Sequence, residues 1–205
     1  MVSKLDTAWD LFLDGKTSEA KQLVEQDFSI DTCTDFSLLN LMGYLLLAEK
    51  DYASCIRIYE NYILFSQQNG DKEHEHIGLH QLAMIYRDQG DFHKALKLIE
   101  DEEKIVEEHF PNDNLKKAVN NYEQGYVRFK LNNLDEALTF MNLSLKQSLE
   151  TDDVISQACS YRGLGEIYLA FGDTQLANMH FEKAIELFKS VDESEGIKEI
   201  EKLMT

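Results

Sequence analysis

Apolar and small residues recur along the 205-residue chain at helical spacing, in stretches separated by short polar turns. In the third stretch, Leu79, Leu82 and Tyr86 follow the i, i+3, i+7 pattern of an amphipathic helix. The turn Gly90-Asp91 follows, where glycine can end one helix with a left-handed backbone and aspartate can cap the next. We therefore expect two antiparallel helices joined by a tight turn.

This helix pair occurs five times. A small residue in the second helix recurs every 35 to 42 residues, and another small residue lies twelve positions before it. Repetition at this period indicates stacked supersecondary units, and small residues allow the two helices of a unit to approach closely. The small-residue pairs are Ala8 and Ala20, Gly43 and Cys55, Ala83 and Ala95, Gly125 and Ala137, and Gly165 and Ala177.

The small residues, and the apolar positions between them, resemble the tetratricopeptide repeat (TPR). Repeats of about 40 residues are similar to those of kinesin light chains and bacterial peptide-pheromone receptors. The pattern and the resemblance indicate an all-α fold: a right-handed α-α superhelix (TPR-like solenoid) of five helix pairs plus a C-terminal capping helix. With no linker in the sequence, we expect one domain over 1–205, with repeats at approximately 3–34, 35–70, 71–111, 112–151 and 152–191 and a capping helix at 193–204.

The turns carry the same logic. Each helix pair is joined by a short polar turn in which glycine, asparagine or lysine comes first, and acidic turns stand where the family often closes a repeat with proline. The joining turns are Gly15-Lys16, Lys50-Asp51, Gly90-Asp91, Asn132-Asn133 and Gly172-Asp173.

The fourth repeat departs from the pattern, because three large core positions of its first helix are polar. Burying such groups without partners costs about 1–3 kcal/mol each. Either the helix slips so that the aromatic residues one position later fill the core, or those aromatic residues line an exposed surface as anchors for a partner. The polar residues are Asn121, Gln124 and Arg128, and the aromatic residues are Tyr122, Tyr126 and Phe129.

The resemblance implies that the first helices of successive repeats line a concave groove. Such a groove suits a peptide with apolar anchors and a carboxylate that the arginines would bind. Ordinary packing between helices and a homodimer contact are the alternatives, and the lysine/asparagine clamp of chaperone-tail binders is not found. Trp9 and Phe12 lie at the N-terminal end of this face. The candidate groove residues are Asn40, Tyr44, Leu47, His80, Met84, Arg87, Tyr122, Tyr126, Phe129, Arg162 and Glu166.

The net charge of −18 disfavours nucleic-acid binding, which depends on neutralising phosphates, and it disfavours anionic membrane surfaces. An acidic excess is also common on soluble surfaces. No apolar run reaches the ~18 residues of a membrane span, and no secretory signal is recognisable. Three widely spaced cysteines do not suggest a disulfide framework, so we predict reduced thiols and a cytoplasmic location.

Candidate chemistry is sparse. His74-Glu75-His76 and His80 place two imidazoles on one helix face but offer no third metal ligand, so we interpret them as solvated histidines at a helix start. Phosphate-binding loops and nucleophile elbows are not found, and Cys159 fits a small position in a helix pair. We expect no enzyme activity, no metal and no cofactor.

The sequence therefore predicts a non-catalytic module that binds a protein or peptide segment in a groove centred on repeats two to four. One alternative is a sensor of a small signalling peptide, like the pheromone receptors. Those receptors often carry a DNA-binding domain ahead of the repeats, and we expect none because the repeats begin near residue 5. The other alternative is a self-associating homodimer.

Overall fold

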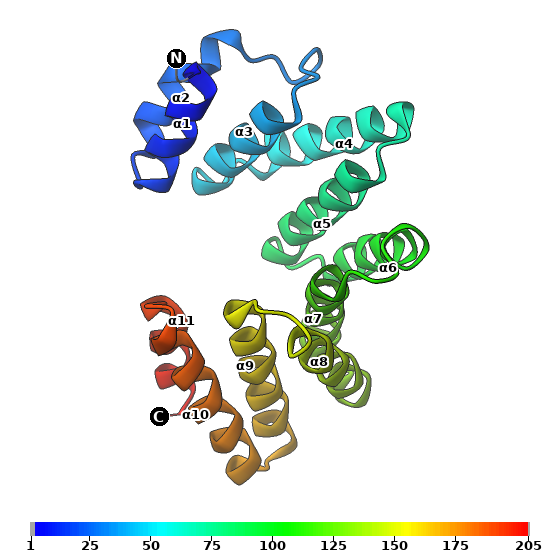
Figure 1. Ribbon diagram of the computed structural model, residues 1–205, viewed down its shortest axis with the longest axis vertical. Coiled ribbons are helices and arrows are strands. Elements are labelled where there is room, and N and C mark those ends of the chain that lie inside the picture. The colour runs from blue at the N-terminus through cyan, green and yellow to red at the C-terminus, as the bar shows by residue number, and fades with distance from the viewer. Residues whose placement is uncertain (1–2, 205) are drawn as a thin grey trace. The chain divides into compact units, whose positions relative to one another are not determined.

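The computed structural model describes residues 3–204, in which every regular element is helical (Figure 1). The prediction of an all-α fold is confirmed. The chain divides into two compact units, Met1–Leu98 (unit 1) and Ile99–Thr205 (unit 2). The helices are α1 (Lys4–Leu13), α2 (Thr17–Val24), α3 (Phe36–Ala48), α4 (Tyr52–Asn69), α5 (Lys72–Asp88), α6 (Phe92–His109), α7 (Asn114–Lys130), α8 (Leu134–Ser148), α9 (Val154–Phe171), α10 (Thr174–Ser190) and α11 (Ser194–Leu203), with a short 3-10 helix, η1 (Glu25–Asp27).

Unit 1 is built from helices that pack on their neighbours in chain order. Contacts join α1 to α2, α2 to α3, α3 to α4 and α4 to α5, and the first helices α1 and α3 also touch each other. Its core is filled by fully buried large side chains, among them Leu39, Ile58, Tyr59 and Tyr62. Burial of these apolar surfaces is the main stabilising contribution in a stack of amphipathic helices.

Unit 2 repeats this arrangement. Contacts join α7 to α8, α8 to α9, α9 to α10 and α10 to α11, and the first helices α7 and α9 also touch. One cluster centres on Met141 and Leu164, and a second centres on Phe181 and Phe188. The short helix α11 covers the end of the second cluster, where Ile200 is fully buried.

The small residues are the places where helices meet, as the sequence predicts. The thiol of Cys55 donates a hydrogen bond to the carbonyl of Gly43, with 3.5 Å between sulfur and oxygen. A Cβ atom added at Gly125 would lie 3.1 Å from the carbonyl oxygen of Ala137. All ten small residues of the five pairs are buried. Their size is therefore required by the approach of one helix to another.

The turns follow the predicted chemistry. The first residue of each of the five joining turns has a left-handed backbone, with φ between 60° and 83°. The strain-free residue there is glycine, and Lys50 and Asn132 adopt the same conformation. Where the family often places proline, aspartates cap the next helix instead. These caps are Asp71 on α5, Asp113 on α7 and Asp153 on α9.

Within residues 3–204, no helix has an apolar stretch long enough to cross a membrane.

Candidate functional site

Three aromatic side chains form a cluster on the first helices of unit 1. Phe12 of α1 stacks on Tyr44 of α3 with the ring centroids 5.8 Å apart. Trp9 packs edge-on against both rings, at 6.0 Å and 6.1 Å. Gln81 of α5 donates a hydrogen bond to the Tyr44 hydroxyl at 3.1 Å. We call Trp9, Phe12 and Tyr44 the unit 1 aromatic cluster; all three rings are half-buried and remain accessible on one side.

The other predicted groove residues of unit 1 are also half-buried. Asn40 accepts a hydrogen bond from the Tyr59 hydroxyl at 2.9 Å, so its side chain is tied to the core of the unit. Leu47 packs against the same core. On α5, Met84 and Arg87 are half-buried, like His80. The structure therefore brings Tyr44 together with the two aromatic residues at the N-terminal end.

Helix α7 keeps the register of the other repeats despite its polar residues. Gly125 lies against α8, as the small residues of the other repeats do, and Asn121, Gln124 and Arg128 are buried. The expectation that the helix slips is wrong, because the polar side chains occupy the core positions themselves. The aromatic residues one position later are half-buried and pack against the edge of the core.

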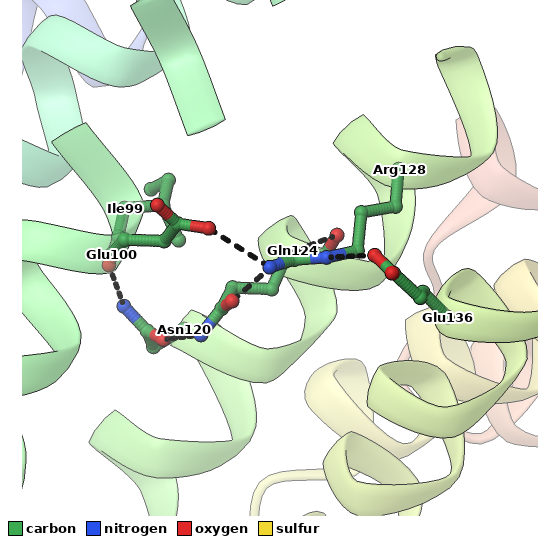
Figure 2. Close-up of polar contacts among 6 residues, drawn as sticks. All are labelled: Ile99, Glu100, Asn120, Gln124, Arg128 and Glu136. Atoms are coloured by element: carbon green, nitrogen blue, oxygen red, sulfur yellow. Dashed lines mark hydrogen bonds and ion pairs between the residues drawn. The ribbon is translucent and has the colours of Figure 1, made fainter. Parts of the chain in front are cut away.

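The buried polar side chains satisfy one another (Figure 2). The Gln124 amide nitrogen donates to Asn120 Oδ1 at 3.0 Å, and the Asn120 amide nitrogen donates to the carbonyl oxygen of Ile99 at 3.0 Å. Arg128 Nη1 donates to Gln124 Oε1 at 2.8 Å. A buried polar network of this kind is stable only when its members are paired, and this chain of contacts links α7 to the second half of α6.

Arg128 closes the network at its solvent end. Its Nη2 donates to Glu100 of α6 at 3.0 Å, and its Nε donates to Glu136 of α8 at 3.2 Å. Its guanidinium carbon also lies 4.1 Å from the ring centroid of Phe140. Asn120, Gln124 and Arg128 follow i, i+4, i+8 spacing. This spacing places them on one helix face and was the available sequence signal for the network, which the sequence interpretation missed.

A second site, on the first helices of unit 2, is centred on Arg162 of α9. Arg162 Nη2 donates to the Tyr122 hydroxyl of α7 at 2.8 Å, and Tyr122 stacks on Tyr126 at 6.1 Å. Nε of Arg162 lies 3.6 Å from Glu166 Oε1, and Nη1 forms an ion pair with Glu199 of α11. We call these five residues the arginine site. Four of them are predicted groove residues, and Phe129 lies at its edge.

Glu199 is the member that the sequence interpretation missed. It lies 33 residues after Glu166, and the fully buried Ile200 lies 33 residues after the fully buried Ile167. The same offset relates Gly196 to Gly163. Extending the repeat by one shorter step would therefore have placed Glu199 on the row of Glu166.

The Glu166 carboxyl has a raised pKa, because its burial outweighs the opposite effects of Arg162 and Lys130, while Glu199 adds to the rise. Below the ordinary value of 4.5 both the folded and the unfolded chain carry the proton, so no stability is lost. As pH rises through the raised pKa, the folded chain loses stability relative to the unfolded chain, which ionises more easily.

We therefore expect Glu166→Gln to gain stability relative to the unchanged chain as pH rises from about 4 to about 7. Glutamine keeps the shape and has no charge to desolvate. Urea unfolding at both pH values measures the difference, and Glu182→Gln, a change at an exposed carboxylate of α10, is the control. A pH-independent difference for Glu166→Gln would contradict the assignment.

The histidines do not form a metal centre. His74 Nδ1 lies 2.7 Å from Asp71 Oδ2, and its ring stacks on Phe36 at 3.9 Å. His76 is buried, so the expectation that it is solvated is wrong: it lies on the packed face of α5. Within residues 3–204, histidines, cysteines and acids form no group of three or more that could hold a metal ion.

Comparison with known proteins identifies the class. Residues 114–190 and 79–101 match family models described as tetratricopeptide repeat. The resemblance seen in the sequence is confirmed, and the chain carries tetratricopeptide repeats. This fold is consistent with a protein-interaction module. No curated protein matches the chain.

Solved structures of low sequence identity share the fold. BtubC (BKLC) from P. vanneervenii is 17% identical, with 90% of this chain and 78% of that chain covered, at a TM-score of 0.73. Nearly identical TPR-like repeats from Podosopora anserina are 18% identical, with coverage of 91% and 94% and a TM-score of 0.69. MamA from Desulfovibrio magneticus RS-1 is 17% identical, with coverage of 91% and 94% and a TM-score of 0.62. At such identities these likenesses concern the fold alone.

Proposed function

We propose that the chain is a non-catalytic interaction module that binds a protein or peptide segment along the first helices of its pairs. The observation that supports this is the presence, in each unit, of half-buried aromatic rings on first helices. In unit 1 they are Trp9, Phe12 and Tyr44, and in unit 2 they are Tyr122 and Tyr126. Rings that are held by neighbours and open on one side make good anchors for a partner, since they add apolar contact at little entropic cost.

Polar groups beside the rings define the ligand chemistry. Gln81 and Asn40 hold polar atoms next to the unit 1 aromatic cluster, where an amide or a main chain could exchange hydrogen bonds. In unit 2, Arg162 and Lys130 place positive charge beside Tyr122 and Tyr126 on a chain of net charge −18. A segment with apolar side chains and a carboxylate complements this chemistry.

The charge of the chain also supports the proposal that nucleic acids and anionic membranes are not the partners, since −18 would repel both. We place the module in the cytoplasm, where the free thiols of Cys33, Cys55 and Cys159 would stay reduced.

The test is a peptide array followed by affinity measurement in solution. Tyr126→Ala is expected to weaken binding of the selected peptides by at least about tenfold, about 1.4 kcal/mol, because it removes an anchor ring. The control is Met179→Ala, since Met179 is 56% exposed on the second helix α10. Equal affinities for both variants, or loss of binding in both, would contradict the proposed face. Mass in solution distinguishes a homodimer.

A further inference from the structure

The arginine site is already occupied by a part of the chain itself. Glu199 of α11 forms an ion pair with Nη1 of Arg162, on the face of unit 2 that carries Tyr122 and Tyr126. A carboxylate is the group that a partner would use to bind an arginine flanked by rings. The C-terminal helix therefore places on this site the same chemistry that the proposed ligand carries.

Arg162 has more binding capacity than this contact uses. Its guanidinium is mostly buried, and its Nε, which lies 3.6 Å from Glu166, donates no hydrogen bond to any atom of residues 3–204. Glu199 touches a single nitrogen, and its side chain is 50% exposed. An exposed, single-point ion pair is a weak interaction compared with a two-point carboxylate contact. A second carboxylate can therefore compete with Glu199.

Helix α11 is held by few contacts. It has ten residues, and only Gly196 and Ile200 are buried. Gly196 lies against Phe188 of α10, where an added Cβ would come within 2.8 Å of the ring. A helix this short is marginal without tertiary packing, so its docking depends on Ile200, on this close approach and on Glu199.

We propose that Glu199 is an internal ligand of the arginine site, and that a partner segment presenting a carboxylate beside an apolar side chain displaces it. This inference rests on the proposed binding function, and it names the partner chemistry and a form of regulation for the same face. Release of Glu199 frees Nη1 of Arg162, while Tyr122 and Glu166 keep the guanidinium in place.

The test follows the Nε–H signal of Arg162 by NMR in the full-length chain. The chain has four arginines, so the spectrum is simple, and loss of one signal in Arg162→Lys assigns it. The titrant is N-acetyl-glutamate amide, and N-acetyl-glutamine amide is its uncharged control. Glu199→Gln removes the internal charge. Glu195→Gln, on the same helix and paired with Lys198 instead, is the matched control.

We expect the glutamate derivative to bind Glu199→Gln at least about fivefold more tightly than the unchanged chain, with Glu195→Gln behaving like the unchanged chain. Amide exchange at Ile200 should accelerate as the titrant binds the unchanged chain, since α11 loosens. Equal affinity for Glu199→Gln and the unchanged chain would overturn the inference, and so would a signal that does not move in any variant. Binding of array peptides that is indifferent to Glu199→Gln would leave the proposed function standing without the internal ligand. The expected titration with no array peptide bound would have the opposite meaning.

Discussion

Replacing Arg128 by methionine is expected to lower the free energy of unfolding by about 3 kcal/mol. Arg128 is 7% exposed and joins Gln124, Glu100 and Glu136. Methionine has a similar length but no donor, so Gln124 Oε1 would remain buried without its partner. The loss of this pairing outweighs the gain from burying a more apolar side chain.

Urea unfolding followed by circular dichroism measures this change. Arg57→Met is the matched control, because the Arg57 side chain is 58% exposed and pairs with Asp31 at the surface. We expect that control to stay within about 0.5 kcal/mol of the unchanged chain. Gln124→Leu combined with Arg128→Met should cost less than the sum of the single changes, because the two residues share a hydrogen bond. Additive costs would show that the network does not act as a unit.

Replacing Gly165 by alanine is expected to destabilise the protein by about 2 kcal/mol. The added Cβ would lie 2.4 Å from Cε1 of Phe181, whose side chain is 1% exposed and has no room to withdraw. Alanine favours a helix over glycine by about 1 kcal/mol, which works in the opposite direction. The overlap is the larger effect, because it involves a ring enclosed by the core.

Thermal and urea unfolding test this expectation, with a rescue as the control. Phe181→Leu combined with Gly165→Ala should be less destabilised than the sum of the two changes, since leucine leaves space for the methyl group. Gly90→Ala differs in kind: nothing lies within 4 Å of its Cβ position, and its φ of +81° makes the cost one of backbone strain. A rescue of Gly90→Ala by Phe181→Leu, or none for Gly165→Ala, would contradict this explanation.

Local chemistry explains why so much of the fold was predictable. The turn at Gly90-Asp91 and the twelve-residue interval from Gly43 to Cys55 are properties of neighbouring residues, and each recurs five times. Repetition allows a weak repeat to be placed by analogy with a strong one. The helices, turns and close contacts could therefore be read from the chain.

The polar core of α7 could not be read in this way. A pattern rule assigns large apolar residues to core positions, so Gln124 and Arg128 look misplaced until their partners are known. Glu100 and Glu136, which complete the network, come from other helices, and only the tertiary structure brings them near. Glu199 was missed because its repeat step of 33 residues is shorter than the others. The candidate groove residues remain a prediction of the sequence.

The position of α6 has a consequence for dividing the protein. The division between the units falls inside this helix, between Leu98 and Ile99. Ala95 is buried on the side of unit 1, whereas Ile99 and Glu100 receive hydrogen bonds from α7. A fragment cut at the division would lose either a buried alanine or the acceptors of a polar core. Expression boundaries for either half should therefore include α6 in full, and the helix would be duplicated when both halves are produced.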